Sequence, residues 1–271
     1  MGSVDSSGVD WPAPEWVGFE SGRQYRASRH VHLGDVGQTG ELRLEALARF
    51  LQDVATDDAL AVDLRAQLGG TWVLRRLSVE VIRAPHFNDD IEFATFCTGV
   101  GHAWAERRTD LTAIDGTLLA RTVAIWVLID QAGGRPLALG DEFFAIYPEA
   151  RRRKVSARLG HRKPPDDAAA RRWSLRESDF DFLDHVNNAR YLEAVEDELV
   201  SVLPKHQPVR AELEFRGAVE RGDALELRSE VVAGLEGESE LWVWLVSDGD
   251  VRMSARLRTQ FVPEPRRALP R

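Results

Sequence analysis

Apolar residues recur along this chain with two different periods, and the two periods alternate in the same order twice. Two stripes have the spacing of one face of an α-helix: Leu47, Phe50, Leu51 and Val54 in the first, and Leu192, Val195, Leu199 and Val202 in the second. After each stripe come long runs that are typical of half-buried strands. The order predicts one helix followed by three or four long antiparallel strands, present in two copies.

The strand regions of the two halves also match each other. SVEVIRAPHFNDDIEF (78–93) and AELEFRGAVERGDALEL (211–227) each run from a strand, through an arginine and a turn with an aspartate, into another strand. An offset of 133 positions matches three pairs, which are Arg83 with Arg216, Asp90 with Asp223, and Gly116 with Gly249. In the helices, Asp53 matches Asp197 at an offset of 144, so we place 11 extra residues of the first half within 59–70.

A curled antiparallel sheet can bury its apolar face around one helix with an apolar stripe. We therefore predict an α+β protein with a tandem (double) hotdog fold, in which the two sheets pair side by side. The predicted ranges are a mobile N-terminal arm (1–21), an N-terminal hotdog (22–147), a basic linker (148–171), a C-terminal hotdog (172–264) and a tail (265–271).

Composition excludes several classes of protein. With 35 Lys and Arg against 44 Asp and Glu, the net charge is −9, so we expect no nucleic-acid partner. The single cysteine, Cys97, excludes an internal disulfide, fits a reducing compartment and is expected to be a small buried residue. Residues 1–19 lack the apolar run of a signal peptide, and no stretch reaches the ~20 residues of a membrane span. We expect a cytoplasmic protein without a membrane span.

The densest group of polar side chains stands where a loop enters the second predicted helix. Residues 181–191 read DFLDHVNNARY. Helix capping accounts for an asparagine at this boundary, either Asn187 or Asn188, and Asx-turns account for Asp181 and Asp184. The same residue types also suit chemistry at a helix start, so both interpretations stay open.

These motifs resemble the acyl-acyl carrier protein thioesterases, a family of the 4-hydroxybenzoyl-CoA-thioesterase-like superfamily. SDFDFLDHVNNARYLEAVEDE is similar to the signature of that family's second half, and TWVLRRLSVEVIRAPHFNDDIEFATFCTGVGHAWAERRTDL to a segment of its first half. The resemblance covers roughly residues 22–262. It implies a double hotdog and a thioester hydrolase of fatty acid biosynthesis.

The resemblance also implies site residues. Asp181 and His185 match the family's aspartate and histidine, whereas Leu183 stands where the family has an asparagine. Ala218 and Val219 stand where an acid or a thiol is expected.

Thioester hydrolysis needs an activated water and stabilisation of the developing oxyanion. Asp181 and His185 are four positions apart and can converge on a water. Backbone N–H groups at a helix start are unpaired and lie at the positive end of the helix dipole, so those near Asn187 and Asn188 can bind the oxyanion. We therefore predict Asp181, His185, Asn187 and Asn188 as the catalytic group. His30, His32, His86 and His102 lack metal-ligand spacing, so we assign no metal and no cofactor.

The first half has no such cluster in its corresponding loop, HLGDVGQTGEL (32–42). We therefore predict that the two halves have different roles. The second half would hold the reaction centre, and the first half would form an apolar pocket for the acyl chain. The residues predicted to bind the acyl chain are Leu47, Phe50, Leu51, Trp72 and Leu74.

The run RRRKVSARLGHRK (151–163) is basic and contains no acid. Carrier proteins are acidic, so we predict carrier binding by Arg151, Arg152, Arg153 and Lys154. A solvated linker and a site for the nucleotide of coenzyme A are the alternatives.

The function that the sequence predicts is hydrolysis of acyl-acyl carrier protein thioesters to free fatty acid and holo carrier protein, by a monomer or homodimer. An acyl-CoA thioesterase and a non-catalytic acyl-binding hotdog protein are the alternatives. A hotdog hydratase or dehydratase is a further alternative, but the usual Asp-x-Asn-Pro-x-His spacing is absent.

Overall fold

The computed structural model describes residues 21–64, 68–130, 133–181, 184–234 and 237–263. The first half contains β1 (Gln24–His30), η1 (Leu33–Asp35), α1 (Leu44–Ala61), β2 (Thr71–Val81), β3 (Asp90–Val100), β4 (Trp104–Ala113) and β5 (Leu118–Ile129). Two short helices follow, α3 (Asp141–Ile146) and η2 (Pro148–Arg152). The second half contains β6 (Ala169–Trp173), η3 (Glu177–Asp179), α4 (Asn188–Val202), β7 (His206–Phe215), β8 (Leu225–Ala233), β9 (Glu238–Ser247) and β10 (Asp250–Phe261). In the described ranges no helix is long and apolar enough to cross a membrane.

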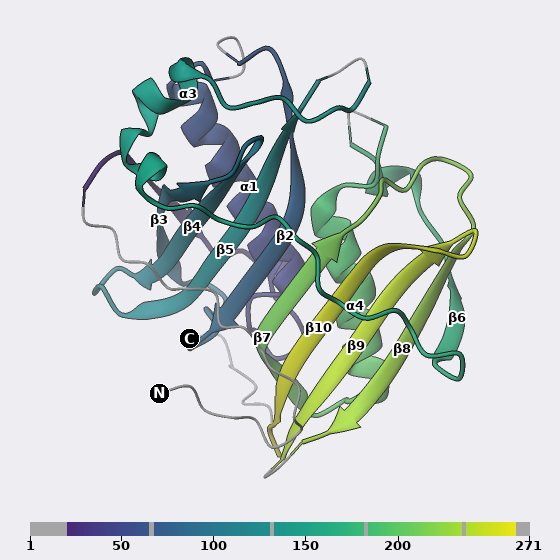
Figure 1. Ribbon diagram of the computed structural model, residues 1–271. Helices are drawn as coiled ribbons and strands as arrows, with labels where there is room; N and C mark the ends of the chain where they lie inside the picture. Colours follow the sequence, from purple (N-terminus) through teal and green to yellow (C-terminus); the bar gives the residue numbers. More distant parts are fainter. Residues whose placement is uncertain (1–20, 65–67, 131–132, 182–183, 235–236, 264–271) are drawn as a thin grey trace.

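The ten strands form one antiparallel sheet in the order β1-β3-β4-β5-β2-β7-β10-β9-β8-β6. Read from either end, this order repeats the same arrangement, so the two halves are related by a pseudo-twofold axis. The halves join where β2 pairs with β7, with Ser78 opposite Glu212. Figure 1 shows α1 and α4 on the same side of the curled sheet. This is the double hotdog that the repeat predicts.

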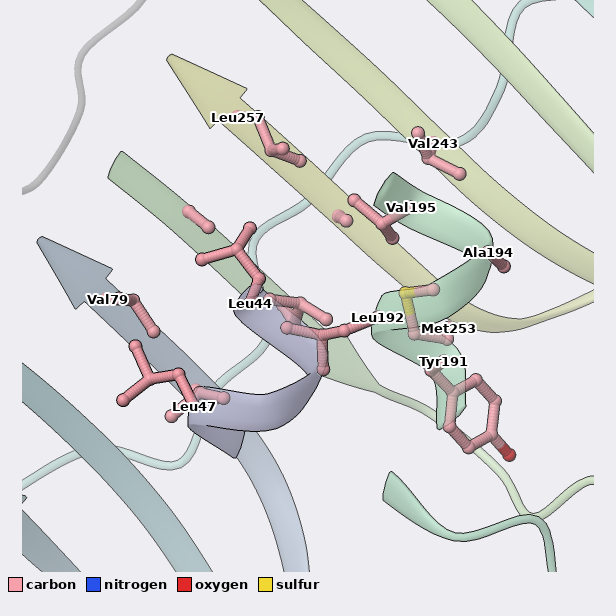
Figure 2. Packing of buried hydrophobic residues seen from close by; sticks show 14 of the residues in the cluster. Leu44, Leu47, Val79, Tyr191, Leu192, Ala194, Val195, Val243, Met253 and Leu257 are labelled. Carbon is pink, nitrogen blue, oxygen red and sulfur yellow. The ribbon is translucent and has the colours of Figure 1, made fainter. Parts of the chain in front are cut away.

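The apolar faces of the two helices share one core with the inner face of the sheet. Leu47 and Phe50 of α1 and Leu192 and Val195 of α4 are at most 5% exposed. Figure 2 shows the start of α1 lying against α4, with strand side chains such as Val243 packed beside them. Because each fully buried apolar side chain contributes about 1.5–3 kcal/mol, the helices are held by the sheet and by each other.

The loops that precede the two helices have the same hydrogen bonds at an offset of 144. In the first half, Gly37 N–H donates to the Glu41 carbonyl at 2.9 Å; in the second, Asp181 N–H donates to the His185 carbonyl at 2.9 Å. Buried Asp35 and Asp179 correspond too, since each accepts the N–H of the residue three positions earlier. The offset that the helix sequences suggested therefore extends back into both loops.

In the strands the offset of 133 is wrong by one residue until the turn after β4. Asp89 accepts the His86 N–H, and Asp223 accepts the Glu220 N–H. These equivalent turns are 134 positions apart, so Asp89 and not Asp90 corresponds to Asp223. Likewise, Ile82 and Arg216 are the equivalent pair, because Ile82 N–H donates to the Leu119 carbonyl and Arg216 N–H to that of Arg252.

The cause is a difference in turn length between the halves. The β4–β5 turn has three residues between Ala113 and Thr117, whose backbones are hydrogen bonded. The β9–β10 turn has two, Asp248 and Gly249, both with positive φ (52° and 82°), as in a type I′ hairpin. Gly116 and Gly249 match at 133 because both are the left-handed glycine of the turn (φ 84° and 82°).

The predicted basic linker lies along the outer face of the sheet, where Figure 1 shows the chain crossing in front of the strands. Trp104 Nε1 donates to the Val155 carbonyl at 2.9 Å, and Trp244 Nε1 donates to the Arg162 carbonyl at 2.9 Å. The His161 N–H donates to Glu214. This segment is therefore tied to both halves. The domain boundaries stay a prediction.

A carboxylate from one half caps the helix of the other. Glu196 of α4 accepts the N–H groups of Leu44 at 2.5 Å and of Glu45 at 3.3 Å, at the start of α1. A helix start has unpaired N–H groups that bind anions well. Arg43, the N-cap residue, makes no side-chain hydrogen bond to the N–H groups at the helix start. Glu196 therefore takes the place of a local cap and connects the two halves.

We expect Glu196→Gln to become more stable relative to the wild type as pH rises. Burial raises the pKa of Glu196 from 4.5 to about 7, although the two N–H bonds oppose this. The folded protein thus retains a proton that the unfolded chain loses, so this group's contribution to stability falls as pH rises from 4.5 to about 7. Glutamine keeps an acceptor oxygen and does not ionise.

The measurement is thermal unfolding of both proteins at pH 5, 6, 7 and 8. The Tm of Glu196→Gln minus that of the wild type should increase by a few degrees across this range, since ~1 kcal/mol is a few degrees in a domain of this size. Asp197→Asn, on the exposed side of the same turn, is the control and should follow the wild type. A Tm difference that stays constant, or decreases with pH, would contradict the assignment.

Candidate active site

The loop that enters α4 is a tight turn closed by its own backbone. The Asp184 N–H donates to the Asp181 carbonyl at 3.0 Å, and Phe180 and Val186 form a bridge. Asp184 adopts φ 61°, a left-handed conformation that aspartate tolerates better than most residues. Leu183, where the sequence departs from the family, lies outside the described residues.

Asp181 and His185 occupy the two ends of this turn. Their backbones are joined by the hydrogen bond at 2.9 Å. Asp181 is half-buried and His185 is exposed. Asp184 is exposed and pairs with Arg221, which also pairs with Glu177. The turn therefore brings the backbones of Asp181 and His185 together, whereas Asp184 belongs to a surface ion-pair cluster.

The two asparagines have different surroundings at the start of α4. The Asn187 side chain is the N-cap and accepts the Ala189 N–H at 3.0 Å, while the Asn187 N–H donates to the Asp179 carbonyl at 2.8 Å. Within the described chain the Asn188 N–H makes no hydrogen bond. Of the backbone N–H groups of Asn187, Asn188 and Ala189, that of Asn188 is therefore the one left to a ligand.

Asn188 and Ala189 also line a cavity on the inner face of the sheet. Its volume is about 20 Å³, which is room for one water molecule. The lining residues come from α1, β2, β4, β5 and α4: Ala48, Leu51, Gln52, Ala55, Leu74, Leu77, Arg107, Thr109, Thr122, Ala124, Trp126, Asn188, Ala189 and Leu192. The cavity thus connects the start of the second helix to the interior of the first half.

Three alanines leave this space open in the first half. Ala48, Ala55 and Ala124 line the cavity. Their equivalents across the pseudo-twofold axis are Leu192, Leu199 and Leu257, which are 1%, 3% and 0% exposed. At these three repeated positions the first half therefore has the smaller side chain, and the cavity has room beside it.

Polar groups line the cavity on the side of β4 and β5. Arg107 donates to Asp58 at 2.8 Å, and buried Asp58 also accepts from Arg23 and from the Tyr147 hydroxyl at 2.9 Å. This cluster contains two guanidinium groups and one carboxylate. Trp126 Nε1 is buried and has no hydrogen-bond partner among the described residues.

Gln52, Arg107 and Trp126 of this cavity were not among the predicted site residues. A signal for them exists, since alternate residues of a strand point to one face and Thr122, Ala124 and Trp126 alternate along β5. On α1, Ala48, Leu51, Gln52 and Ala55 have the i, i+3, i+4, i+7 spacing of one helix face. That face lies beside the strongly apolar stripe used to identify the helix.

The residues predicted to bind the acyl chain lie in three places. Leu51 and Leu74 line the cavity. Leu47 and Phe50 lie in the main core, at 4% and 5% exposed. Trp72 packs on Phe143, with ring centroids 5.9 Å apart, in a second core cluster.

Of the four residues predicted to bind a carrier protein, the three arginines have acidic partners within this chain. Arg151 pairs with Asp141 at 2.7 Å, Arg152 with Glu149 at 2.6 Å, and Arg153 with Glu106. The backbone of Lys154 pairs with that of Val100.

Cys97 does not have the environment of a nucleophile. Burial raises the pKa of its thiol to about 12, so the thiolate is scarce at neutral pH. Among the described residues no group of histidines, cysteines and acids could hold a metal ion.

Comparison with known proteins identifies the family. The acyl-ACP thioesterase N-terminal domain (ACP, acyl carrier protein) matches residues 22–147, and the acyl-ACP thioesterase C-terminal domain matches residues 162–261. The chain belongs to the acyl-ACP thioesterase family. The enzyme is therefore a thioester hydrolase.

Relatives of this thioesterase include uncharacterised and named proteins. The protein Rv2001 of Mycobacterium tuberculosis is 26% identical over 239 residues, 88% of this chain and 93% of that protein. The chloroplastic oleoyl-acyl carrier protein thioesterase 1 of Arabidopsis thaliana is 24% identical over 233 residues, which are 76% of this chain and 64% of the plant protein.

Solved structures share the fold of this thioesterase. The 12:0-ACP thioesterase from Umbellularia californica superposes with a TM-score of 0.76, at 21% identity, over 88% of this chain and 94% of that one. An acyl-ACP thioesterase from Bacteroides thetaiotaomicron has a TM-score of 0.73 at 19% identity, over 88% and 98% of the two chains. These likenesses concern the architecture.

Proposed function

We propose that this thioesterase hydrolyses acyl-ACP thioesters to free fatty acid and holo carrier protein. The observation that carries the proposal is the cavity that joins Asn188 and Ala189, at the start of α4, to Leu51, Leu74 and the alanines of the first half. A thioester carbonyl at the helix start would thus have its acyl chain beside apolar side chains. The described cavity holds about one water molecule, so an acyl chain enters by rearrangement of the lining side chains.

The proposed reaction is direct attack by water. Asp181 orients the water or His185, and His185 positions the water and accepts its proton. The water oxygen bonds to the thioester carbon, and the Asn188 N–H stabilises the oxygen that becomes negative. The C–S bond then breaks, and the sulfur leaves as the carrier's thiol after taking up a proton. The products are a fatty acid and the free phosphopantetheine thiol.

Acyl-CoA as the substrate and acyl binding without catalysis are the competing functions. The family favours a carrier protein. Arg151, Arg152, Arg153 and Lys154 keep their predicted role in carrier binding, although the internal acid partners of the three arginines must then exchange for those of the carrier.

Hydrolysis of matched substrates tests the function. The purified protein is given the same acyl chains, from eight to eighteen carbons, as thioesters of acyl carrier protein and of coenzyme A. We expect kcat/KM to be higher for the carrier thioesters at each accepted chain length. Equal or higher values for coenzyme A would favour the acyl-CoA thioesterase, and tight binding without release of thiol would favour the acyl-binding protein.

We expect Asp181→Ala and His185→Ala each to reduce kcat by about 10²–10⁴-fold, the usual effect of removing a general acid or base. Because both side chains lie in a surface turn, the Tm of each variant should stay within a few degrees of the wild type. Asp184→Ala, in the same turn, is the control and should retain turnover. Unchanged turnover in both variants would place the reaction centre elsewhere; lost turnover with gross unfolding would indicate a structural role.

We expect Ala55→Leu to shift the preferred acyl chain to shorter lengths, because it gives α1 the leucine found at the equivalent position 199. The measurement is kcat/KM across the same chain lengths. Ala61→Leu, exposed near the end of the same helix, should leave the preference unchanged. Overpacking costs about 1–3 kcal/mol, so the Tm is recorded as well. An unchanged preference with a lowered Tm would show that this face is ordinary core.

A further inference from the structure

The pseudo-twofold axis relates Gln52 to Glu196. The offset of 144 that matches the loops and helices also matches Leu44 with Asn188, Glu45 with Ala189 and Gln52 with Glu196. Glu196 shows what a side chain at this position reaches, because it accepts the N–H groups of Leu44 and Glu45 at the start of the other helix. By the same symmetry, Gln52 faces the start of α4.

The contacts of Gln52 agree with this placement. Gln52 lines the cavity together with Asn188 and Ala189. Its side-chain amide makes no hydrogen bond to any described residue, whereas its backbone carbonyl accepts from Thr56 at 2.8 Å. A glutamine amide carries two donor hydrogens and one acceptor oxygen. The start of α4, where the reaction is proposed, therefore has beside it the Gln52 amide, which is available to a ligand. At the start of α1 the carboxyl group of Glu196 is already hydrogen bonded to the backbone.

From this juxtaposition we infer that Gln52 is a catalytic residue that binds the thioester group: its side-chain N–H donates to the carbonyl oxygen beside the Asn188 N–H. The inference rests on the proposed thioesterase reaction. Two donors, one from each half, then surround the oxygen that becomes negative. The pair has the composition of an oxyanion hole, in which each donor contributes most when charge develops.

The same comparison explains why one half reacts and the other does not. At the start of α1, the carboxyl group of Glu196 occupies the N–H groups that a substrate oxygen would need. A carboxylate there would also repel a developing oxyanion. Gln52 is neutral and has donors, so the start of α4 can receive negative charge from a substrate. Arg107, the charged residue that lines this cavity, adds positive potential.

Two substitutions of Gln52 test the inference. Gln52→Met keeps the length of the side chain but removes the donors, and should reduce kcat by about 10²–10³-fold, as expected for one oxyanion-hole donor. Gln52→Glu places a carboxyl group beside the start of α4, as Glu196 does beside the start of α1. It should be at least as impaired at pH 8 and should recover, relative to the wild type, as pH falls and its carboxyl group gains a proton that it can donate. Thr56→Glu adds the same charge one turn along α1 at an exposed position and should retain wild-type kcat.

Turnover at pH 6, 7 and 8 is measured with each Tm on the same preparations. Wild-type turnover in Gln52→Met, or an equal and pH-independent loss in Gln52→Glu and Thr56→Glu, overturns the inference while leaving the thioesterase reaction standing. If the wild type hydrolyses no thioester, the proposed function fails. Calorimetric binding of an acyl-CoA ketone analogue, in which CH₂ replaces the sulfur, then decides. At least tenfold weaker binding to Gln52→Met supports carbonyl binding by Gln52, and equal binding refutes it.

Discussion

The crossing of α1 and α4 is the contact on which the rest of the molecule depends. Each helix buries its apolar stripe against the sheet and also against the other helix. Leu44 at the start of α1 is hydrogen bonded to Glu196 in the middle of α4, and Asn188 at the start of α4 lines a cavity with Gln52 from the middle of α1. A side chain on the third turn of one helix can therefore reach the unpaired N–H groups of the other. Glu196 does so at the start of α1. This hydrogen bond adds a second connection between the halves, whose sheets meet where β2 pairs with β7.

The two halves share the order of their strands and the loops before their helices, but they differ at a few repeated positions. The loops before the helices have the same turns and nearly the same hydrogen-bond lengths. At three repeated positions the second half has buried Leu192, Leu199 and Leu257, whereas the first half has alanines that line the cavity. Because interiors are close-packed, a methyl group in place of an isobutyl group opens space without any change of fold. Small side chains at these positions are what the proposed acyl site in the first half requires.

The repeat could be predicted from sequence because its signals are local. The helix stripes and the turn glycines Gly116 and Gly249 each depend on residues close together in the chain, and the same is true of the polar cluster at 181–191 that predicts the site. The correct partner of Asp223, which is Asp89 and not Asp90, could not be predicted. The extra residue of the first half lies in the turn after β4, and it leaves the alternation of apolar and polar residues along the strands unchanged. Arg107 and Trp126 were missed for a related reason. Alternation shows which residues share a face of a strand, but only the packing of α1 and α4 determines what that face meets.

The two helix starts also illustrate opposing requirements of stability and reactivity. At α1 the N–H groups are satisfied by Glu196, which suits a structural junction. At α4 the cap formed by Asn187 satisfies the Ala189 N–H and leaves that of Asn188 without a partner in the described chain. An unpaired, partly buried N–H costs stability, and the same group is the one that a substrate oxygen can use. A second capping side chain on the Asn188 N–H would stabilise α4, but it would also occupy the group that is proposed to bind the substrate oxygen. The stability lost at Asn188 and the proposed chemistry thus both arise from this one unpaired N–H group.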